Sequence, residues 1–300
     1  MKAVRLHGYG DVDQLHYEEV PTPEPADDEV LVKVTAISLN PVDWKIRQGF
    51  LKAAVPLQFP VILGRDVSGQ VTAVGSKVQN MKVGDKVFGM VNFTYAEYLK
   101  DKPENLAILP DGLDAEKAAA YPVVTLTGAQ LMERGVQPKP GKTILVTGAV
   151  GSVGRAAVHV AKTHGATVMA GVRAKQKTDA GTLGADRVVA IDDDAEIATL
   201  KDLDAIADTV GGETIAKLIP ALKKSGVVAS VLGKPKGAEE AGIHVAEIYA
   251  QPDSPRLRAL GEELARGEFT IPIAGRFRLS EMREAHQFAE HAGGKVLIIP

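Results

Sequence analysis

The chain has 300 residues, a formal net charge of −3 and no cysteine. This length is enough for one or two domains with a real core. The small net charge and the lack of a long apolar run point away from nucleic acid and membranes as partners. The missing cysteines exclude disulfides, thiol catalysis and cysteine-ligated zinc. Residues 1–8 lack the apolar region of a secretion signal, so we expect a cytoplasmic protein.

The first part of the chain is rich in short strands. We predict strands at Lys2–Leu6, Glu29–Ile37, Asp66–Val74 and Lys86–Met90, which are rich in β-branched and apolar residues. The proline-rich residues 21–25 indicate an extended connection. Because glycine turns separate the strands, the pattern favours a compact barrel-like β domain.

From Thr143 onward, strands alternate with helices. The predicted strands are Thr143–Thr147, Thr167–Val172, Arg187–Ile191, Asp204–Asp208, Gly226–Leu232 and Ile243–Tyr249. The predicted helices between them are Val153–His164, Lys175–Leu183, Ala195–Leu200 and Glu213–Leu222. This alternation is typical of an α/β doubly wound parallel sheet.

The last part of the chain begins with a predicted helix at Pro255–Arg266, which is expected to end the α/β domain. A strand at Phe277–Leu279, a helix at Ser280–His291 and a strand at Lys295–Ile299 follow, with Ser280 as the expected N-cap. This tail could return to the first domain.

A glycine-rich turn joins the strand Thr143–Thr147 to the helix that follows it. The pattern is A-x-G-x-x-G, and a strand, such a turn and a helix form the opening of a dinucleotide-binding unit. The competing interpretation is a tight turn that needs small residues only for packing. A P-loop is excluded because no Gly-Lys-Ser/Thr ends the turn. The predicted cofactor-binding residues of this turn are Gly148, Ala149, Gly151, Ser152, Val153 and Gly154.

Basic residues follow the second strand of this domain. NAD-binding proteins carry an acidic residue there for the ribose 2′-hydroxyl, but residues 166–178 contain none. Instead Arg173, Lys175 and Lys177 are present, and a 2′-phosphate needs such positive charge. We therefore predict NADPH as the cofactor, with Arg173 as the first candidate for the phosphate. The alternative is that these side chains are solvated charges at a helix start.

Several further motifs occur along nearly the whole chain, in one order. They are residues 40–49 (NPVDWKIRQG), 64–69 (GRDVSG), 83–89 (VGDKVFG), 95–98 (YAEY), 125–127 (TLT), the glycine-rich turn, 207–212 (ADTVGG) and 294–296 (GKV). Together they resemble the medium-chain dehydrogenase/reductase superfamily, in its zinc-free quinone oxidoreductase (zeta-crystallin-like) branch. The resemblance implies a GroES-like domain at 1–122 and 268–300, and a Rossmann domain at 123–267. It also implies that NADPH binds in a cleft between the two.

The resemblance also suggests roles for individual residues. Asn40 stands in a loop that the family directs into the cleft, where its amide could contact the nicotinamide, the ribose or the substrate carbonyl, although simple turn chemistry would also explain it. Thr127 is placed at the nicotinamide or phosphate side. The remaining candidates are Asp43 and Lys45, as catalytic residues near Asn40, and Lys177, Leu232 and Gly233, as cofactor-binding residues.

No metal site is expected. Arg65 stands where zinc-dependent relatives carry a ligating histidine, and the seven histidines are scattered. Without a metal the substrate must itself be a good hydride acceptor, as quinones and α,β-unsaturated carbonyl compounds are. Tyr95 could donate a proton or merely pack, and no single general acid is assigned.

Two functions remain open. One is an NADPH-dependent reductase of quinones or activated alkenes, which acts on a small electrophile. The other is a protein of the same fold that binds NADPH for sensing or regulation. An alcohol dehydrogenase without zinc is less favoured, because simple carbonyls need polarisation.

Two expectations concern the outside of the α/β domain. The short segment Lys234–Gly242 suggests a more open substrate side. The strand Ile243–Tyr249 should form a sheet edge, and exposed edges invite pairing. Because the family often forms dimers through this edge, we expect a homodimer.

Overall fold

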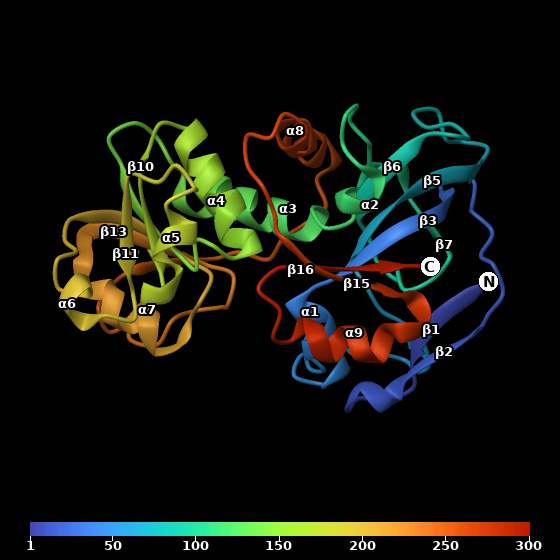
Figure 1. The fold of residues 1–300 in the computed structure, drawn as a ribbon, viewed down its shortest axis with the longest axis horizontal. Coiled ribbons are helices and arrows are strands. Elements are labelled where there is room, and N and C mark those ends of the chain that lie inside the picture. Colours follow the sequence, from blue (N-terminus) through green and yellow to red (C-terminus); the bar gives the residue numbers. More distant parts are fainter. The chain divides into compact units, whose positions relative to one another are not determined.

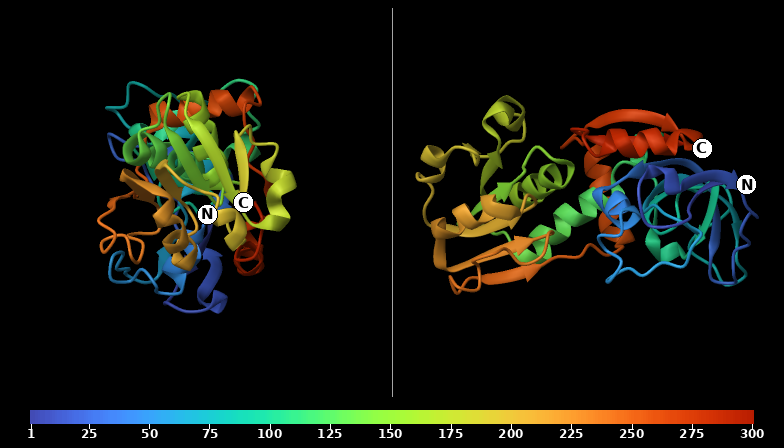
Figure 2. Two further views of the ribbon diagram at one scale, coloured as in Figure 1. Left: turned by 90° about the vertical axis from the view of Figure 1, so that its left-hand side faces the viewer. Right: turned by 90° about the horizontal axis from the view of Figure 1, so that it is seen from below.

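The computed structural model describes residues 1–300 and divides them into two compact units. Unit 1 comprises Met1–Val123 and Pro252–Pro300, and unit 2 comprises Val124–Gln251. Both ends of the chain therefore lie in unit 1 (Figures 1 and 2). The first boundary lies one residue from the predicted one, but the second lies between residues 251 and 252, not between 267 and 268.

Helix α8 (Ser254–Ala265) explains the shifted boundary. The sequence predicts it as the end of the α/β domain, yet it packs on unit 1. At Gly261 an added Cβ would lie 2.8 Å from Phe88 Cζ and 3.1 Å from Pro110 Cγ. Only a glycine allows this helix to come so close to the β-rich unit.

Unit 1 consists mainly of antiparallel strands. Its larger sheet has the order β15-β16-β3-β5-β6-β8, with β7 also paired to β3, and a smaller sheet has the order β2-β1-β4. The strands are β1 (Lys2–Leu6), β2 (Leu15–Glu19), β3 (Val30–Leu39), β4 (Val61–Ile62), β5 (Asp66–Val74), β6 (Lys86–Met90), β7 (Tyr98–Asp101), β8 (Leu106–Ile108), β15 (Ile273–Arg278) and β16 (Lys295–Ile299). The last two confirm that the C-terminal tail returns to the first domain.

The helices of unit 1 are short. They are α1 (Pro41–Arg47), α2 (Ala115–Ala118), α8 and α9 (Met282–Ala289), and α3 (Pro122–Gln130) begins here and continues into unit 2. The prediction of Ser280 as N-cap of the last helix is wrong. Ser280 lies in a 3-10 turn, because the Glu281 carboxylate accepts the Arg278 N–H at 2.7 Å and so closes that turn before α9 begins.

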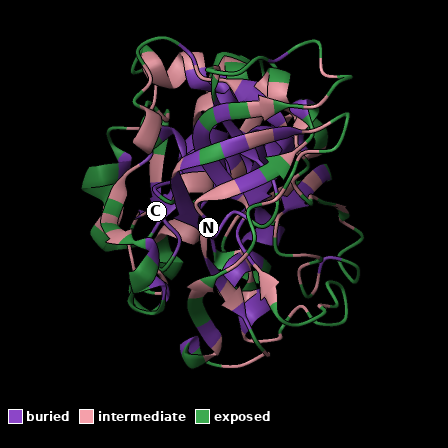
Figure 3. Cartoon of the chain, turned by 90° about the vertical axis from the view of Figure 1, so that its right-hand side faces the viewer, coloured by how far each residue is buried: buried purple, intermediate pink, exposed green.

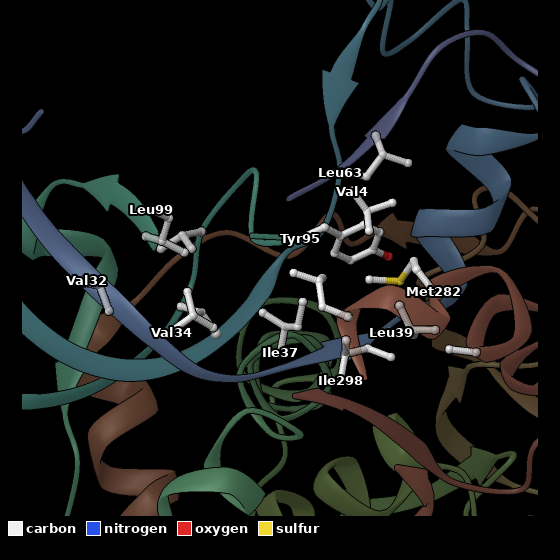
Figure 4. Close-up of a cluster of buried hydrophobic side chains, with 14 of the residues drawn as sticks. Val4, Val32, Val34, Ile37, Leu39, Leu63, Tyr95, Leu99, Met282 and Ile298 are labelled. Carbon is white, nitrogen blue, oxygen red and sulfur yellow. The ribbon is translucent and has the colours of Figure 1, made fainter. Parts of the chain in front are cut away.

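The core of unit 1 follows the alternation of its strands. In β3, Val30, Val32 and Val34 are buried while Lys33 is exposed, and Figure 3 shows the same alternation of buried and exposed positions along the strands. Figure 4 shows the Tyr95 side chain among buried apolar residues of several elements, including Val4 and Met282. Burial of this apolar surface is the main stabilising contribution to the unit.

Unit 2 contains a six-stranded parallel sheet in the order β11-β10-β9-β12-β13-β14. Its strands are β9 (Thr143–Thr147), β10 (Thr167–Val172), β11 (Arg187–Ala190), β12 (Leu203–Asp208), β13 (Leu222–Ser230) and β14 (His244–Glu247). The strand order reverses between β9 and β12, so the carboxyl ends of these two strands form the topological switch point where α/β sheets bind ligands. The predicted doubly wound sheet is confirmed.

The helices of unit 2 are α4 (Ser152–Thr163), α5 (Lys177–Ala180), α6 (Asp194–Ile197) and α7 (Gly212–Leu218), and α4 and α5 are visible beside the strands in Figure 1. All four end earlier than the sequence predicts, α4 by one residue and the others by three or four. Pro220 lies in a 3-10 turn after α7, where its missing N–H stops the helix, so that β13 begins at Leu222. None of the helices combines the length and the apolar character that crossing a membrane requires.

Candidate active site

The turn between β9 and α4 has the geometry of a phosphate cradle. Gly148 has a φ of +62°, which L side chains rarely adopt. An added Cβ at Gly154 would lie 2.2 Å from the Gly148 carbonyl oxygen, so the helix can rest on the turn only through a glycine. At Gly151, the N-cap of α4, an added Cβ would contact a single atom, the Gly148 carbonyl oxygen at 3.1 Å. The surface of Gly151 is therefore open to a ligand.

The first turn of α4 supplies the donors. The backbone N–H groups of Ser152, Val153 and Gly154 have no acceptor within the helix, and the helix dipole gives this end partial positive charge. Buried Arg155 fixes the turn, since its guanidinium donates to the Val150 carbonyl at 2.9 Å and to Asp179 at 2.5 Å. The arrangement can bind a pyrophosphate.

The end of β10 carries the predicted basic residues. Arg173 follows the strand directly, is exposed, and its guanidinium has no hydrogen-bond or ion-pair partner. Lys177 differs, because its ammonium is paired with Glu196. A second acidic residue lies nearby: the Asp192 carboxylate accepts the Ala174 N–H at 2.7 Å. The sequence could not show this neighbour, since it comes from the end of the next strand.

Asp208 ties three strand ends together. Its buried carboxylate accepts hydrogen bonds from Thr147 Oγ1 of β9 and Ser230 Oγ of β13, each at 3.0 Å. It also accepts the backbone N–H groups of Val210 at 3.1 Å and Gly211 at 2.9 Å. The loops that follow β12 and β13 are therefore held in fixed positions at the switch point.

A hollow of about 830 Å³ lies between these two loops, within unit 2. Both Leu232 and Gly233 line it, as do Val210 and the first residues of α7. Leu232 is 46% exposed, and its N–H donates to Ser230 Oγ at 3.1 Å. Residues 234–237 of the short segment after β13 also line the hollow. That this segment leaves the substrate side open stays a prediction.

Unit 1 holds a buried polar cluster at one end of three neighbouring strands. In the register, Leu39 lies opposite Val296, so Asn40 and Lys295 follow as the next pair. Ser38 of β3 lies opposite Asp66 of β5. Sheet pairing thus brings together side chains that are far apart in the sequence.

Hydrogen bonds connect Lys295, Asn40 and Asp66 at the centre of this cluster. The Lys295 ammonium donates to the Leu39 carbonyl at 2.9 Å, to Asn40 Oδ1 at 2.6 Å and to Asp66 Oδ2 at 3.0 Å. Asn40 Nδ2 donates to Asp66 Oδ2 at 2.8 Å, and Ser38 Oγ donates to the same oxygen at 2.7 Å. The other Asp66 oxygen accepts the Val123 N–H at 2.7 Å. Asn40 retains one N–H donor and one acceptor lone pair.

Asp43 lies beside this cluster, in the first turn of helix α1. Its carboxylate accepts the Asn40 backbone N–H at 2.8 Å, which caps the helix. Burial raises the pKa of the Asp43 carboxyl to about 7, although the Asn40 N–H and the Lys295 charge act in the opposite direction. Its local role is therefore structural, and a catalytic role stays a prediction.

Tyr95 connects Asp43 to His286. The Tyr95 hydroxyl lies 3.2 Å from His286 Nε2 and is hydrogen-bonded to the Asp43 carboxylate. Burial raises the pKa of Tyr95 well above its usual value, and burial lowers the pKa of His286 to about 3. Both side chains are fully buried and neutral in this chain of contacts, which favours packing over proton donation for Tyr95.

The remaining predicted residues are Lys45 and Thr127. Lys45 lies on α1, half-buried, and Thr127 is buried in α3. The sequence analysis did not assign site roles to Lys295, Asp66 and Asp208. Each stands in one of the motifs that carried the resemblance, but only the sheet register shows that Lys295 and Asp66 converge on Asn40.

Two family models match the chain. Residues 26–134 match the alcohol dehydrogenase GroES-like domain, and residues 183–298 match the zinc-binding dehydrogenase model. Together they cover parts of both units.

Several known proteins are similar to the chain in sequence. A quinone oxidoreductase homolog of the chloroplast from Spinacia oleracea is 40% identical over 200 residues, which cover 63% of this chain and 60% of that protein. The chloroplast envelope quinone oxidoreductase homolog of Arabidopsis thaliana is 31% identical over 100% of this chain and 98% of its own length. An NADPH-dependent alkenal/one oxidoreductase from the same plant is 33% identical, and the match covers 100% of this chain and 80% of that one.

Solved structures of quinone oxidoreductases are also similar to this chain. The quinone oxidoreductase from Coxiella burnetii has a TM-score of 0.92 and 31% identity, covering 100% of this chain and 99% of its own. The Escherichia coli quinone oxidoreductase complexed with NADPH has a TM-score of 0.88 and 26% identity, with 100% of both chains covered.

Because the second family model is named for zinc binding, the question is whether the residues of this chain could bind a zinc ion. A catalytic zinc ion needs about three convergent protein ligands, in most cases cysteine and histidine. The chain has no cysteine. In the polar cluster of unit 1, the oxygens of Leu39, Asn40 and Asp66 already surround the Lys295 ammonium. These residues do not fit a zinc ion.

Proposed function

Because the chain belongs to the quinone oxidoreductase branch of the medium-chain dehydrogenase/reductase superfamily, we propose that it is an NADPH-dependent oxidoreductase. In this proposal it transfers hydride to quinones or α,β-unsaturated carbonyl compounds and uses no zinc. The names of its relatives support both substrate classes, since they include quinone oxidoreductases and an alkenal/one oxidoreductase.

The observation that carries the proposal is the pairing of an open glycine turn with a free guanidinium. The turn before α4 offers unpaired N–H groups to a pyrophosphate. Arg173 stands at the end of the neighbouring strand β10 without a partner. A guanidinium at this place suits a 2′-phosphate, which it can bind through two hydrogen bonds.

NADPH, when bound, would supply the hydride, and with it the two electrons that reduce the acceptor. The residues of the turn, with Ser152, Val153 and Gly154 donating, hold its pyrophosphate. Leu232 and Gly233 stand at the carboxyl end of β13, where the reactive ring is expected. Thr127 completes the proposed cofactor-binding set, and Lys177 would leave its ion pair with Glu196 to join Arg173.

Asn40 is the residue proposed to face the acceptor. When a quinone or enone receives hydride, negative charge develops on its oxygen, and a fixed donor stabilises that charge. The unused N–H of the Asn40 amide can serve as this donor, with Asp43 fixing the Asn40 backbone and Lys45 adding a positive charge on the same helix. Solvent supplies the proton that completes the hydroquinone or saturated carbonyl product.

Two further parts of the proposal concern the context of the protein. We expect a homodimer through β14, which pairs only with β13 and so leaves one edge of the sheet unpaired. The expected cytoplasmic location stays a prediction, since several relatives are named as chloroplast proteins.

The test measures the oxidation of NADPH, by its absorbance, with a panel of acceptors. The panel contains benzoquinone, phenanthrenequinone, an alkenal and a saturated aldehyde, with NADH in parallel and EDTA present. Turnover of a quinone or the alkenal with NADPH, unchanged by EDTA, is the expected result. Binding of NADPH without turnover of any acceptor would contradict the proposal and favour a sensing or regulatory role.

A further inference from the structure

The orientation of the Asn40 amide decides what this residue can offer a ligand. An asparagine side chain that is turned over exchanges its NH₂ group for its carbonyl oxygen. An acceptor whose oxygen gains negative charge needs the NH₂ group. A reversed amide would present a repelling oxygen instead.

The neighbours of Asn40 discriminate between the two orientations. The Lys295 ammonium can only donate, and it lies 2.6 Å from Oδ1. The Asp66 carboxylate can only accept, and it lies 2.8 Å from Nδ2. In the reversed orientation the ammonium would face NH₂ and the carboxylate would face an oxygen, two repulsive contacts at a site where Asp66 is fully buried.

Neither Lys295 nor Asp66 has a group left for a ligand. All three N–H donors of Lys295 are used, by Leu39, Asn40 and Asp66, and its side chain is 5% exposed. Both Asp66 oxygens are occupied as well, one of them by the Val123 N–H. The side chain that connects these two residues to the proposed acceptor is therefore the Asn40 amide.

The pair is itself anchored to the backbone. Lys295 is held by the Leu39 carbonyl, one residue before Asn40, and it begins strand β16, which pairs with the end of β3. Asp66 begins strand β5 on the other side of β3. The two groups that clamp the amide thus come from the two strands that flank it.

We propose that Lys295 and Asp66 are positioning residues that lock the Asn40 amide with one N–H directed at the acceptor oxygen. This inference rests on the proposed function and deepens it, because it assigns the donor property of the site to a charged pair behind Asn40.

The kinetic test uses variants with benzoquinone as acceptor. Lys295→Met leaves Asp66 as a buried unpaired charge and can prevent folding, so the main variant is the neutral pair Lys295→Met/Asp66→Asn. We expect kcat to fall roughly 10- to 100-fold, as for a small misplacement of a reacting group, with KM for NADPH nearly unchanged. In an Asn40→Ala background the pair should lower kcat no further. A pair variant that keeps wild-type kcat, or lowers it equally with and without Asn40, would overturn the proposal.

A second readout does not depend on activity and leaves Asn40, Lys295 and Asp66 unchanged. The chain has four asparagines, so their side-chain amide signals can be followed by nitrogen-15 NMR. Asp substitutions at the three others, Asn80, Asn92 and Asn105, assign the Asn40 signal by elimination. Asn105, whose amide donates to Asp101 at 2.7 Å, is the matched control with only one partner.

We expect one set of Asn40 signals with slow rotation about the side chain, and hydrogen exchange with water slower than at Asn105. Rotation or exchange as fast as at Asn105 would overturn the proposal. If the wild-type protein turns over no acceptor, the proposed function fails, and the NMR result still decides whether Lys295 and Asp66 lock Asn40.

Discussion

The Lys295 ammonium and the Asp66 carboxylate lie 3.0 Å apart, although 229 positions separate them in the sequence. Their side chains are 5% and 0% exposed. Taking two charges out of water is costly, and the pair is tolerated because further donors and acceptors satisfy both groups. The structure therefore predicts a sharp difference between removing one charge and removing both.

Lys295→Met should lower the free energy of unfolding by about 3 to 5 kcal/mol, since it leaves the Asp66 carboxylate buried without a counter-charge. Addition of Asp66→Asn should recover most of this loss. Urea unfolding of the two variants measures the difference. Equal stability of the single and the double variant would contradict a buried charged pair.

Arg173→Ala should lower kcat/KM for NADPH and leave kcat/KM for NADH nearly unchanged. Loss of a charge-assisted pair to the 2′-phosphate corresponds to a rise in KM for NADPH of roughly 10-fold or more, since such bonds contribute a few kcal/mol at most. The matched control is Lys175→Ala, another exposed basic residue of the same segment. If the ratio of kcat/KM for the two cofactors does not change, Arg173 does not bind the 2′-phosphate.

Alanine substitutions at the two glycines of the α4 turn should affect different properties, stability at Gly154 and NADPH binding at Gly151. Gly154→Ala places a methyl group 2.2 Å from the Gly148 carbonyl oxygen and should cost about 1 to 3 kcal/mol of stability. Gly151→Ala meets one atom at 3.1 Å, so it should fold nearly as stably while its methyl group obstructs the pyrophosphate. Thermal unfolding and NADPH titration separate the two effects. Full NADPH affinity in Gly151→Ala would argue that the turn serves packing alone.

Asp43 should make stability depend on pH. Burial raises the pKa of its carboxyl from 3.8 to about 7 in the folded protein. Between these values the folded protein still holds a proton that the unfolded chain has lost. The free energy of unfolding should therefore fall as pH rises through this window, by roughly 1 kcal/mol per pH unit, and level off above it.

The neutral variant Asp43→Asn lacks this proton, so its stability relative to the wild type should increase as pH rises from 5 towards about 7. Urea unfolding across that range measures the difference. A stability difference that does not change with pH would show that Asp43 stays ionised in the folded protein.

Tyr95→Phe should affect stability more than catalysis. The variant leaves His286 and Asp43 without their shared hydroxyl partner, at a cost of about 1 to 3 kcal/mol. Because the Tyr95 hydroxyl lies against His286 inside unit 1, kcat should change little. A large loss of kcat with unchanged stability would instead support Tyr95 as proton donor. Tyr98→Phe, at a half-buried position on β7, is the control.

The sequence by itself determined the elements whose patterns are local. The strands β9 and β10 have the predicted bounds, because an unbroken apolar run between turn residues is a short-range signal. The glycine turn and the basic end of β10 were readable for the same reason, since a phosphate cradle lies within one strand, one turn and one helix. The two-domain α/β class followed from the change from glycine-separated strands to alternating strands and helices.

Only the tertiary structure decided what surrounds Asn40. Lys295 reaches it through the pairing of β16 with β3, and Asp66 through the pairing of β5 with β3, and no local pattern encodes either register. The same holds for α8, which the sequence assigned to the α/β domain and which packs on Phe88. Long-range pairing depends on which apolar faces bury each other best, a property of the whole chain that no single segment contains.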